Sequence, residues 1–283
     1  MKRLFVTVSL FLVAFAAFAQ FENKAIFSVS QTKKVRFSHG NLQYQASTGT
    51  WRFALNQYDL IGTNNKNISS TYTGWIDLFG FGTSGWESGA VAYQPYSTNT
   101  SNTDYYVGGS ESNSLTDDYS QADWGTSYTE QNGGSPVWRT LTYEEWDYLL
   151  FRRKNASSKF GLATVNNKQG CVLLPDNWTK PNGLNFTSGT ANKYTGSNNN
   201  NVYTADNWAK MEANGAVFLP AAGYRSGDDG KNVGGVGENG DYWTVSTGGS
   251  NFARYLYIFE KEVYLNFSRR SYGVSVRLVS DVE

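Results

Sequence analysis

The clearest pattern in the chain is the alternation of side chains over residues 254–270, RYLYIFEKEVYLNFSRR, which predicts a β-hairpin. Folded about the loop 259–262, one face is apolar and pairs Ile258 with Val263 and Leu256 with Leu265. The other face pairs Tyr257 with Tyr264 and Tyr255 with Asn266. A solvated strand face usually carries Lys, Glu and Thr, so the question is what these tyrosines contact.

The same two-residue period predicts other strands. Near the start of the chain, KKVRFSHGNLQYQASTGTWRFA predicts three strands and a hairpin turn at residues 46–50, with inward positions Val35, Phe37, Leu42, Tyr44, Trp51 and Phe53. Two apolar runs that end in proline, GCVLLP and GAVFLP, predict core strands. VSVRLV at residues 274–279 predicts a closing strand.

Only two segments predict helices. In LTYEEWDYLLFRRK, Thr142 and Glu145 have the spacing of a capping box. In YTADNWAKMEANG, Thr204 is the expected cap and Gly215 the stop. The polar, weakly periodic stretch 84–135 predicts loops. Together these patterns indicate an α+β fold with two helices, short twisted antiparallel sheets and long irregular loops.

The N-terminal sequence and the cysteine count predict an exported protein without internal disulfide bonds. A charged start, an apolar run and an Ala-Phe-Ala cleavage site predict a signal peptide at residues 1–19, followed by one elaborated domain at residues 20–283. No later stretch predicts a transmembrane segment. Cys171 is the only cysteine, so no internal disulfide is possible, and its apolar neighbours predict a buried thiol. Lys+Arg and Asp+Glu both total 24, which argues against a nucleic-acid partner.

The sequence offers few catalytic or metal-binding groups. His39, the only histidine, lies in a strand–turn context, where a surface position is expected instead of a catalytic triad. Residues 80–85 match a dinucleotide-binding glycine pattern, but no helix is predicted after them. In the glycine-rich loop 227–241 a solvated turn is expected, and the candidate calcium ligands are Asp228, Asp229, Glu238 and Asp241. No other cofactor is predicted.

Several segments resemble a known family. VWRTLTYEEWDYLL is similar to the helix start of the formylglycine-generating-enzyme (sulfatase-modifying-factor) branch of the C-type lectin fold, and GAVFLPAAGYR and GDYWTVST through GVSVRLV resemble its later core. This likeness covers residues 136–281, and KKVRFSHGNLQYQ and GWIDLFGFGTSGW extend it to bacterial exported paralogous proteins. The resemblance implies a C-type-lectin-like fold. Residues 243–273 lack the reactive cysteine pair of the enzymatic members, so it implies no oxidase activity.

The chain also resembles the target proteins of diversity-generating retroelements, whose last stretch varies at exposed positions of a fixed frame. Mapped onto this sequence, the frame consists of Trp243, Ala253, Leu256, Ile258, Val263, Gly273, Ser275, Val276 and Leu278. The positions open to change are Thr244, Thr247, Ser250, Asn251, Arg254, Tyr255, Tyr257, Tyr264, Asn266, Ser268 and Tyr272.

Three interpretations of the tyrosines remain open. They form a binding face, or the loops 84–135 cover them, or they are aromatic ladders that stabilise a twisted hairpin. Tyrosines interleaved with Asn and Ser are suited to a surface that is partly exposed to water, which favours a binding face. Arg254, Arg269 and Arg270 would add stacking and carboxylate contacts. The predicted ligand-binding residues are Thr244, Asn251, Arg254, Tyr255, Tyr257, Tyr264, Asn266, Ser268 and Tyr272.

We therefore expect an exported, non-enzymatic protein of the periplasm, the cell surface or the medium that binds a protein or glycan ligand. Two other functions are left open. One is a carbohydrate-processing hydrolase that uses acidic residues of the loop 227–241, such as Asp228 or Asp241. The other is a structural component of a surface appendage, with the polar loops as contacts.

Overall fold

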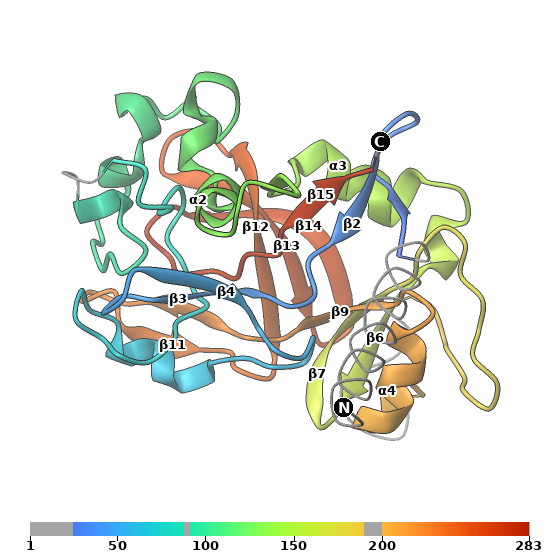
Figure 1. Ribbon diagram of the computed structural model, residues 1–283. Helices are drawn as coiled ribbons and strands as arrows, with labels where there is room; N and C mark the ends of the chain where they lie inside the picture. Colours follow the sequence, from blue (N-terminus) through green and yellow to red (C-terminus); the bar gives the residue numbers. More distant parts are fainter. Residues whose placement is uncertain (1–24, 88–90, 190–199, 283) are drawn as a thin grey trace, which may run out of the picture.

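The computed structural model describes residues 25–87, 91–189 and 200–282 (Figure 1). They form a mixed α/β fold with few helices and several short sheets, whose ladders are antiparallel apart from the parallel pair β6–β8. The predicted signal peptide, residues 1–19, lies outside the described residues. Among the helices that are described, none has the length and apolar character needed to cross a bilayer.

The strands form three sheets and two hairpins within the described residues. One sheet has the order β1 (Phe27–Ser28), β2 (Lys34–Phe37), β15 (Val279–Asp281) and β5 (Trp138–Arg139). A second has the order β8 (Val202–Tyr203), β6 (Phe160–Val165), β7 (Lys168–Leu173) and β9 (Val217–Pro220). The third consists of β12 (Asn239–Thr247), β13 (Phe252–Phe259) and β14 (Glu262–Arg269). The hairpins are β3 (Leu42–Gln45) with β4 (Thr50–Phe53), and β10 (Tyr224–Ser226) with β11 (Asn232–Gly234).

The α-helices of the described residues are α2 (Trp124–Gln131), α3 (Tyr143–Asp147) and α4 (Ala205–Glu212). A π-helical turn, Tyr148–Arg152, continues α3. Short 3₁₀ turns occur at Gly62–Asn67, Val91–Tyr93, Asn102–Tyr105, Val107–Gly109, Asp117–Ala122 and Ala156–Ser158. The prediction of two helices was wrong, because α2 lies inside the stretch predicted as loop. Its residues, WGTSYTEQ, carry no apolar stripe, and the cap is local: the Asp123 side chain accepts a hydrogen bond from the Gly125 backbone.

The other expected elements are confirmed, with one shift. Thr142 and Glu145 form the capping box, since each side chain accepts a hydrogen bond from the other residue's backbone nitrogen, at 3.1 and 3.0 Å. Thr204 caps α4, and Gly215 follows it with φ 91°. The closing strand begins later than predicted, at Val279, because residues 274 and 275 make only isolated bridges.

Two single residues lie as the sequence predicted. Cys171 is fully buried in β7, and burial raises the pKa of its thiol to about 12. His39 lies exposed after β2, with its ring nitrogen 2.7 Å from the carbonyl oxygen of Leu55.

The sheet β12–β14 lies in the middle of the molecule, between β6, β7 and β9 on one side and β3–β4 with the irregular segments on the other (Figure 1). One face joins a core cluster with the second sheet, through Tyr242, Leu256, Ile258, Val263, Leu173, Val217 and Leu219. The opposite face joins a cluster with the irregular segments, through Trp243, Val245, Ala253, Tyr255, Phe81, Leu115 and Trp124. The sheet is therefore covered on both sides over part of its length.

Three buried arginines tie the irregular segments to this core. Arg225 donates to the carbonyl oxygens of Gly230 and Ser97. Arg270 donates to the carbonyl oxygen of Glu111 and lies over the ring of Phe81 at 5.1 Å. Arg277 donates to oxygens of Asn41, His39 and Gln57. None of them pairs with a carboxylate within the described residues, and burial lowers the pKa of Arg225 and Arg277 to about 10.

The capping box of α3 gives a test of local stability. Glu145 also binds Arg139 through two bonds of 2.7 and 2.8 Å, so Glu145→Ala removes a cap and an ion pair at a largely buried position. We expect a loss of about 2 kcal/mol in the free energy of unfolding, against about 1 kcal/mol for Thr142→Ala. Urea unfolding followed by tryptophan fluorescence measures both. The exposed neighbour Glu144→Ala is the control and should change stability by less than about 0.5 kcal/mol.

Candidate functional site

The predicted register of the C-terminal hairpin is confirmed. In β13 and β14, Ile258 lies opposite Val263, Leu256 opposite Leu265, Tyr257 opposite Tyr264 and Tyr255 opposite Asn266. Phe259 and Glu262 also pair, so the turn is shorter than predicted and consists of Glu260 and Lys261.

On one face of this sheet, side chains line up in rows across β12, β13 and β14. We call this surface the tyrosine face; its rows are Trp243–Tyr255–Asn266, Asp241–Tyr257–Tyr264 and Asn239–Phe259–Glu262. Exposure rises along β13 toward the turn: Tyr255 is 7% exposed, Tyr257 and Phe259 are partly exposed, and Tyr264 on the neighbouring strand is 38% exposed. The last two rows form the open end of the tyrosine face.

The irregular segments cover the other end. Leu115 donates from its backbone to the Val245 carbonyl at 2.8 Å, and the Thr247 hydroxyl donates to the Glu111 carbonyl at 2.6 Å. Leu115 also packs in the cluster that holds Trp243 and Tyr255. The irregular segments therefore bury Trp243 and Tyr255 of the first row, as one interpretation of the tyrosines expected, whereas the rows near the turn are accessible to water, as a binding face would require.

Asp241 lies beneath the open end. Its residue is 5% exposed, and Oδ1 is buried without a hydrogen-bond partner in the described part of the chain. Burial alone raises the pKa of this carboxyl to about 8. The carboxyl group is therefore largely protonated at neutral pH.

Two other buried aspartates show how this fold satisfies a carboxylate. Asp77 accepts hydrogen bonds from the Ile61 backbone and from Asn65 at 2.9 and 2.8 Å. Asp123 accepts from the Thr140 backbone and hydroxyl at 2.8 and 2.6 Å. Both help to position loops, whereas Asp241 receives no such support and lies on the face that opens to water.

Burial also raises the pKa of the tyrosine hydroxyls on this face. Burial raises the pKa of Tyr257 to about 12, with further contributions from Tyr264, Asp241 and Glu262. The pKa of Tyr255 rises for the same first reason, and Asp241 is the largest charge that adds to it. Asn239 lowers the pKa of Tyr257 and Asn266 lowers that of Tyr255, which partly offsets these increases. The hydroxyls therefore stay protonated and available as hydrogen-bond donors.

Some predicted binding residues do not lie on this surface. Thr244 is fully buried, because its hydroxyl donates to the Arg254 carbonyl at 3.0 Å, so its predicted exposure was wrong. Tyr255 is also buried rather than open. Arg254 lies on the opposite face, where its guanidinium stacks over Tyr143 and Phe267 at 5.0 and 5.9 Å. Alternation along β13 separates it from the tyrosines.

The remaining predicted residues are spread around the sheet. Asn251 is exposed and accepts a 3.4 Å hydrogen bond from Tyr106, while Ser268 is partly exposed opposite Ala253. Tyr272 is partly buried and stacks on Tyr224 at 6.3 Å. Arg269 is exposed. The contact role predicted for Arg270 was wrong, since the chain turns inward after β14 and buries it.

The four carboxylates of the loop 227–241 do not lie together. Asp228, Asp229 and Glu238 are exposed around the β10–β11 hairpin, whereas Asp241 is buried in β12. The described residues contain no group of three or more His, Cys, Asp or Glu placed to hold a metal ion. Asn239 and Phe259 are residues of the open end that the sequence reasoning missed. The period of two that places Asp241 beside Trp243 would have indicated Asn239.

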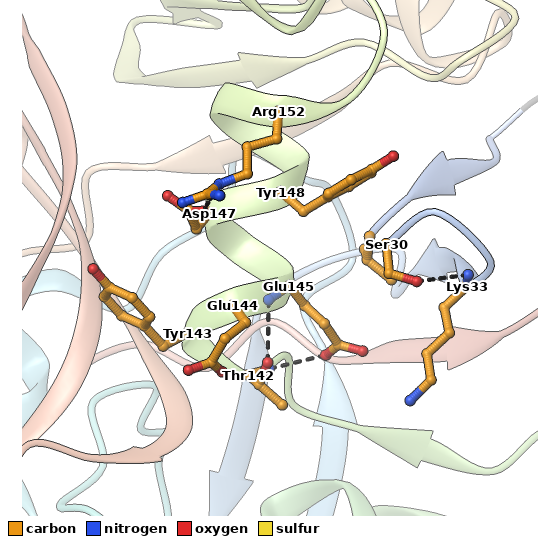
Figure 2. Close-up of a pocket in the computed structure, with 10 residues that line it drawn as sticks. Ser30, Lys33, Thr142, Tyr143, Glu144, Glu145, Asp147, Tyr148 and Arg152 are labelled. Carbon is orange, nitrogen blue, oxygen red and sulfur yellow. Dashed lines mark hydrogen bonds and ion pairs between the residues drawn. The ribbon is translucent and has the colours of Figure 1, made fainter.

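An open cavity of about 470 Å³ lies apart from the tyrosine face, between the turn after β1 and helix α3 (Figure 2). Three of its charged lining residues, Glu145, Asp147 and Arg152, already form ion pairs. Glu145 is bound to the cap and to Arg139, and Asp147 forms an ion pair with Arg152. Lys33, from the turn after β1, and Tyr143, from α3, also line this cavity (Figure 2). We assign no ligand to it.

Comparison with family models, curated proteins and solved structures gave no match to this chain.

The unusual state of Asp241 predicts a specific pH dependence of stability. Between about pH 4 and about pH 8 the unfolded chain has lost this proton while the folded chain retains it, so Asp241 lowers the free energy of unfolding as pH rises. Asp241→Asn removes this effect. The stability of the variant relative to the parent should increase with pH across this window, by at most about 1.4 kcal/mol per pH unit.

Urea unfolding at several pH values checks this prediction. Asp228→Asn, at an exposed position, is the matched control and should leave the pH profile of the parent unchanged. A constant difference between parent and Asp241→Asn at every pH would contradict the raised pKa.

Proposed function

We propose that this chain is an exported recognition protein that binds its ligand at the open end of the tyrosine face, without catalysis. The single observation that carries the proposal is the row Asp241–Tyr257–Tyr264, which runs from a buried, unpartnered carboxyl to a ring 38% exposed.

The free-energy cost of burying the Asp241 carboxyl without a hydrogen-bond partner supports a role in binding. A buried carboxyl without a partner destabilises the fold, and the same position filled by an apolar residue would pack against Tyr257 without that cost. Groups that are perturbed in this way and lie at a surface are candidates for function. A ligand that donates a hydrogen bond to Asp241 would supply the missing partner.

The chemistry of the open end fits a saccharide. Rings of Tyr257, Tyr264 and Phe259 offer flat apolar faces for the C–H surface of a sugar ring. Asn239, Asn266 and the tyrosine hydroxyls can exchange hydrogen bonds with sugar hydroxyl groups, and Asp241 can accept one. Small-molecule sites usually combine many aromatic side chains with a few polar groups.

The finer fold class belongs to the same proposal. Residues 136–281 resemble the C-type lectin fold, and the mixed α/β architecture with short antiparallel sheets is compatible with it. All the mapped frame positions are buried, which is what a fixed frame under a variable surface requires. An exported location follows from the predicted signal peptide.

A glycan array probed with the fluorescently labelled protein tests the proposal. Tyr257→Ala/Tyr264→Ala should lower binding about 10- to 100-fold, because two aromatic contacts are lost. Asp241→Ala should also weaken binding, because it removes the oxygen that would accept the ligand's hydrogen bond. The matched control is Phe267→Ala, which removes a 50% exposed ring from the opposite face of the same strand and should bind as the parent does.

Binding of the labelled protein to intact cells is the second arm. If the parent binds neither glycans nor cells, or if the double tyrosine variant binds as well as Phe267→Ala, the tyrosine face is not the recognition surface. Concentration-dependent assembly of the pure protein, unaffected by both variants, would favour a structural role instead.

A further inference from the structure

A second cavity lies away from the tyrosine face and has an uneven charge. It measures about 430 Å³ and lies between β1–β2, the end of the π-helical turn and the turn that follows β7. Four cationic side chains line it, Lys34, Arg153, Lys154 and Lys159, with one acidic side chain, Asp176. In a chain with zero net charge, this is a local concentration of positive charge.

The acidic side chain is already fully used. Asp176 Oδ1 accepts a 3.1 Å bond from Arg153, and Oδ2 accepts from the backbone and hydroxyl of Ser28 at 2.9 and 2.6 Å. Asp176 thus balances one cation, the buried Arg153. Lys34, Lys154 and Lys159 form no ion pair in the described part of the chain.

The base of the cavity is held in place by the backbone. Arg153 donates to the carbonyl oxygens of Leu149 and Leu174 at 2.7 and 2.9 Å. Lys159 donates to those of Pro175 and Asp176, both at 2.9 Å, which leaves one of its three protons for a ligand. Burial and then the charge of Arg153 lower the pKa of Lys159, as expected where positive charge is not fully compensated.

We propose that this cavity binds a phosphate or sulfate group carried by a small polar molecule. Lys159 contacts the oxyanion from the half-buried base, and the exposed Lys34 and Lys154 approach it from the rim. A volume of about 430 Å³ exceeds what a single ion needs and falls within the range of small-molecule sites. Asn155 and Asn177, which also line the cavity, offer amide groups to the rest of the ligand.

Isothermal titration calorimetry of the full chain tests this inference. Sodium phosphate and sodium sulfate are titrated at low ionic strength, with sodium chloride of equal ionic strength as the blank, and then glucose 6-phosphate and glucose 6-sulfate. We expect binding of phosphate or sulfate in the millimolar range or tighter, and tighter binding of one of the sugar esters. The tighter ester identifies the oxyanion.

The variant Lys34→Ala/Lys154→Ala should weaken this binding at least about tenfold, since both side chains are exposed and the fold does not depend on them. Lys66→Ala/Lys168→Ala, two exposed lysines outside the cavity, gives the same change in net charge and should bind within about twofold of the parent. Tyr257→Ala/Tyr264→Ala should bind as the parent does, because this site is independent of the tyrosine face.

Three results would overturn the inference. They are the absence of any heat with phosphate and sulfate, an equal loss in both lysine pairs, and tighter binding of acetate than of either tetrahedral anion. Thermal unfolding of each variant confirms that the comparison is made between folded proteins.

Discussion

Buried guanidinium groups bound to oxygens of the irregular segments hold this fold together. Arg225, Arg270 and Arg277 each lie in the core without a carboxylate, so backbone and amide oxygens must compensate their charge. Long loops rich in Ser, Asn and Gly have little apolar surface to bury, but they have many carbonyl groups to offer. An arginine reaching into such a loop satisfies several of these groups at once and fixes the loop against the sheet.

This constraint also determines which part of the tyrosine face is open. Arg270 holds the segment near Glu111 against the end of β14, and Leu115 of the same segment lies against Val245. Trp243 and Tyr255 of the first row are therefore covered, and the exposed rings begin one row further toward the turn. The surface proposed for recognition therefore begins where this segment no longer covers the sheet.

The strand register and both helix caps could be predicted because each depends on local sequence. A two-residue period fixes which face a side chain is on, and the spacing of Thr142 and Glu145 fixes where α3 begins. The burial of Tyr255 could not be predicted in this way, because a segment more than one hundred residues earlier in the chain covers it. Helix α2 was missed for a related reason: it is stabilised by tertiary packing of Trp124 and has no apolar stripe. The exposed position expected for Arg270 and the isolated burial of Asp241 likewise depend on contacts that a single sequence does not reveal.

The burial of the Cys171 thiol has a consequence for how this protein folds. The only thiol of the chain lies in a core strand and has a raised pKa, so it is a poor nucleophile, and there is no second cysteine to pair with it. In the described part of the chain the fold is stabilised by packing, hydrogen bonds and ion pairs, without a covalent crosslink. The chain can therefore reach its native state without an oxidant or a disulfide isomerase, and a change in the redox potential of its surroundings leaves the fold intact.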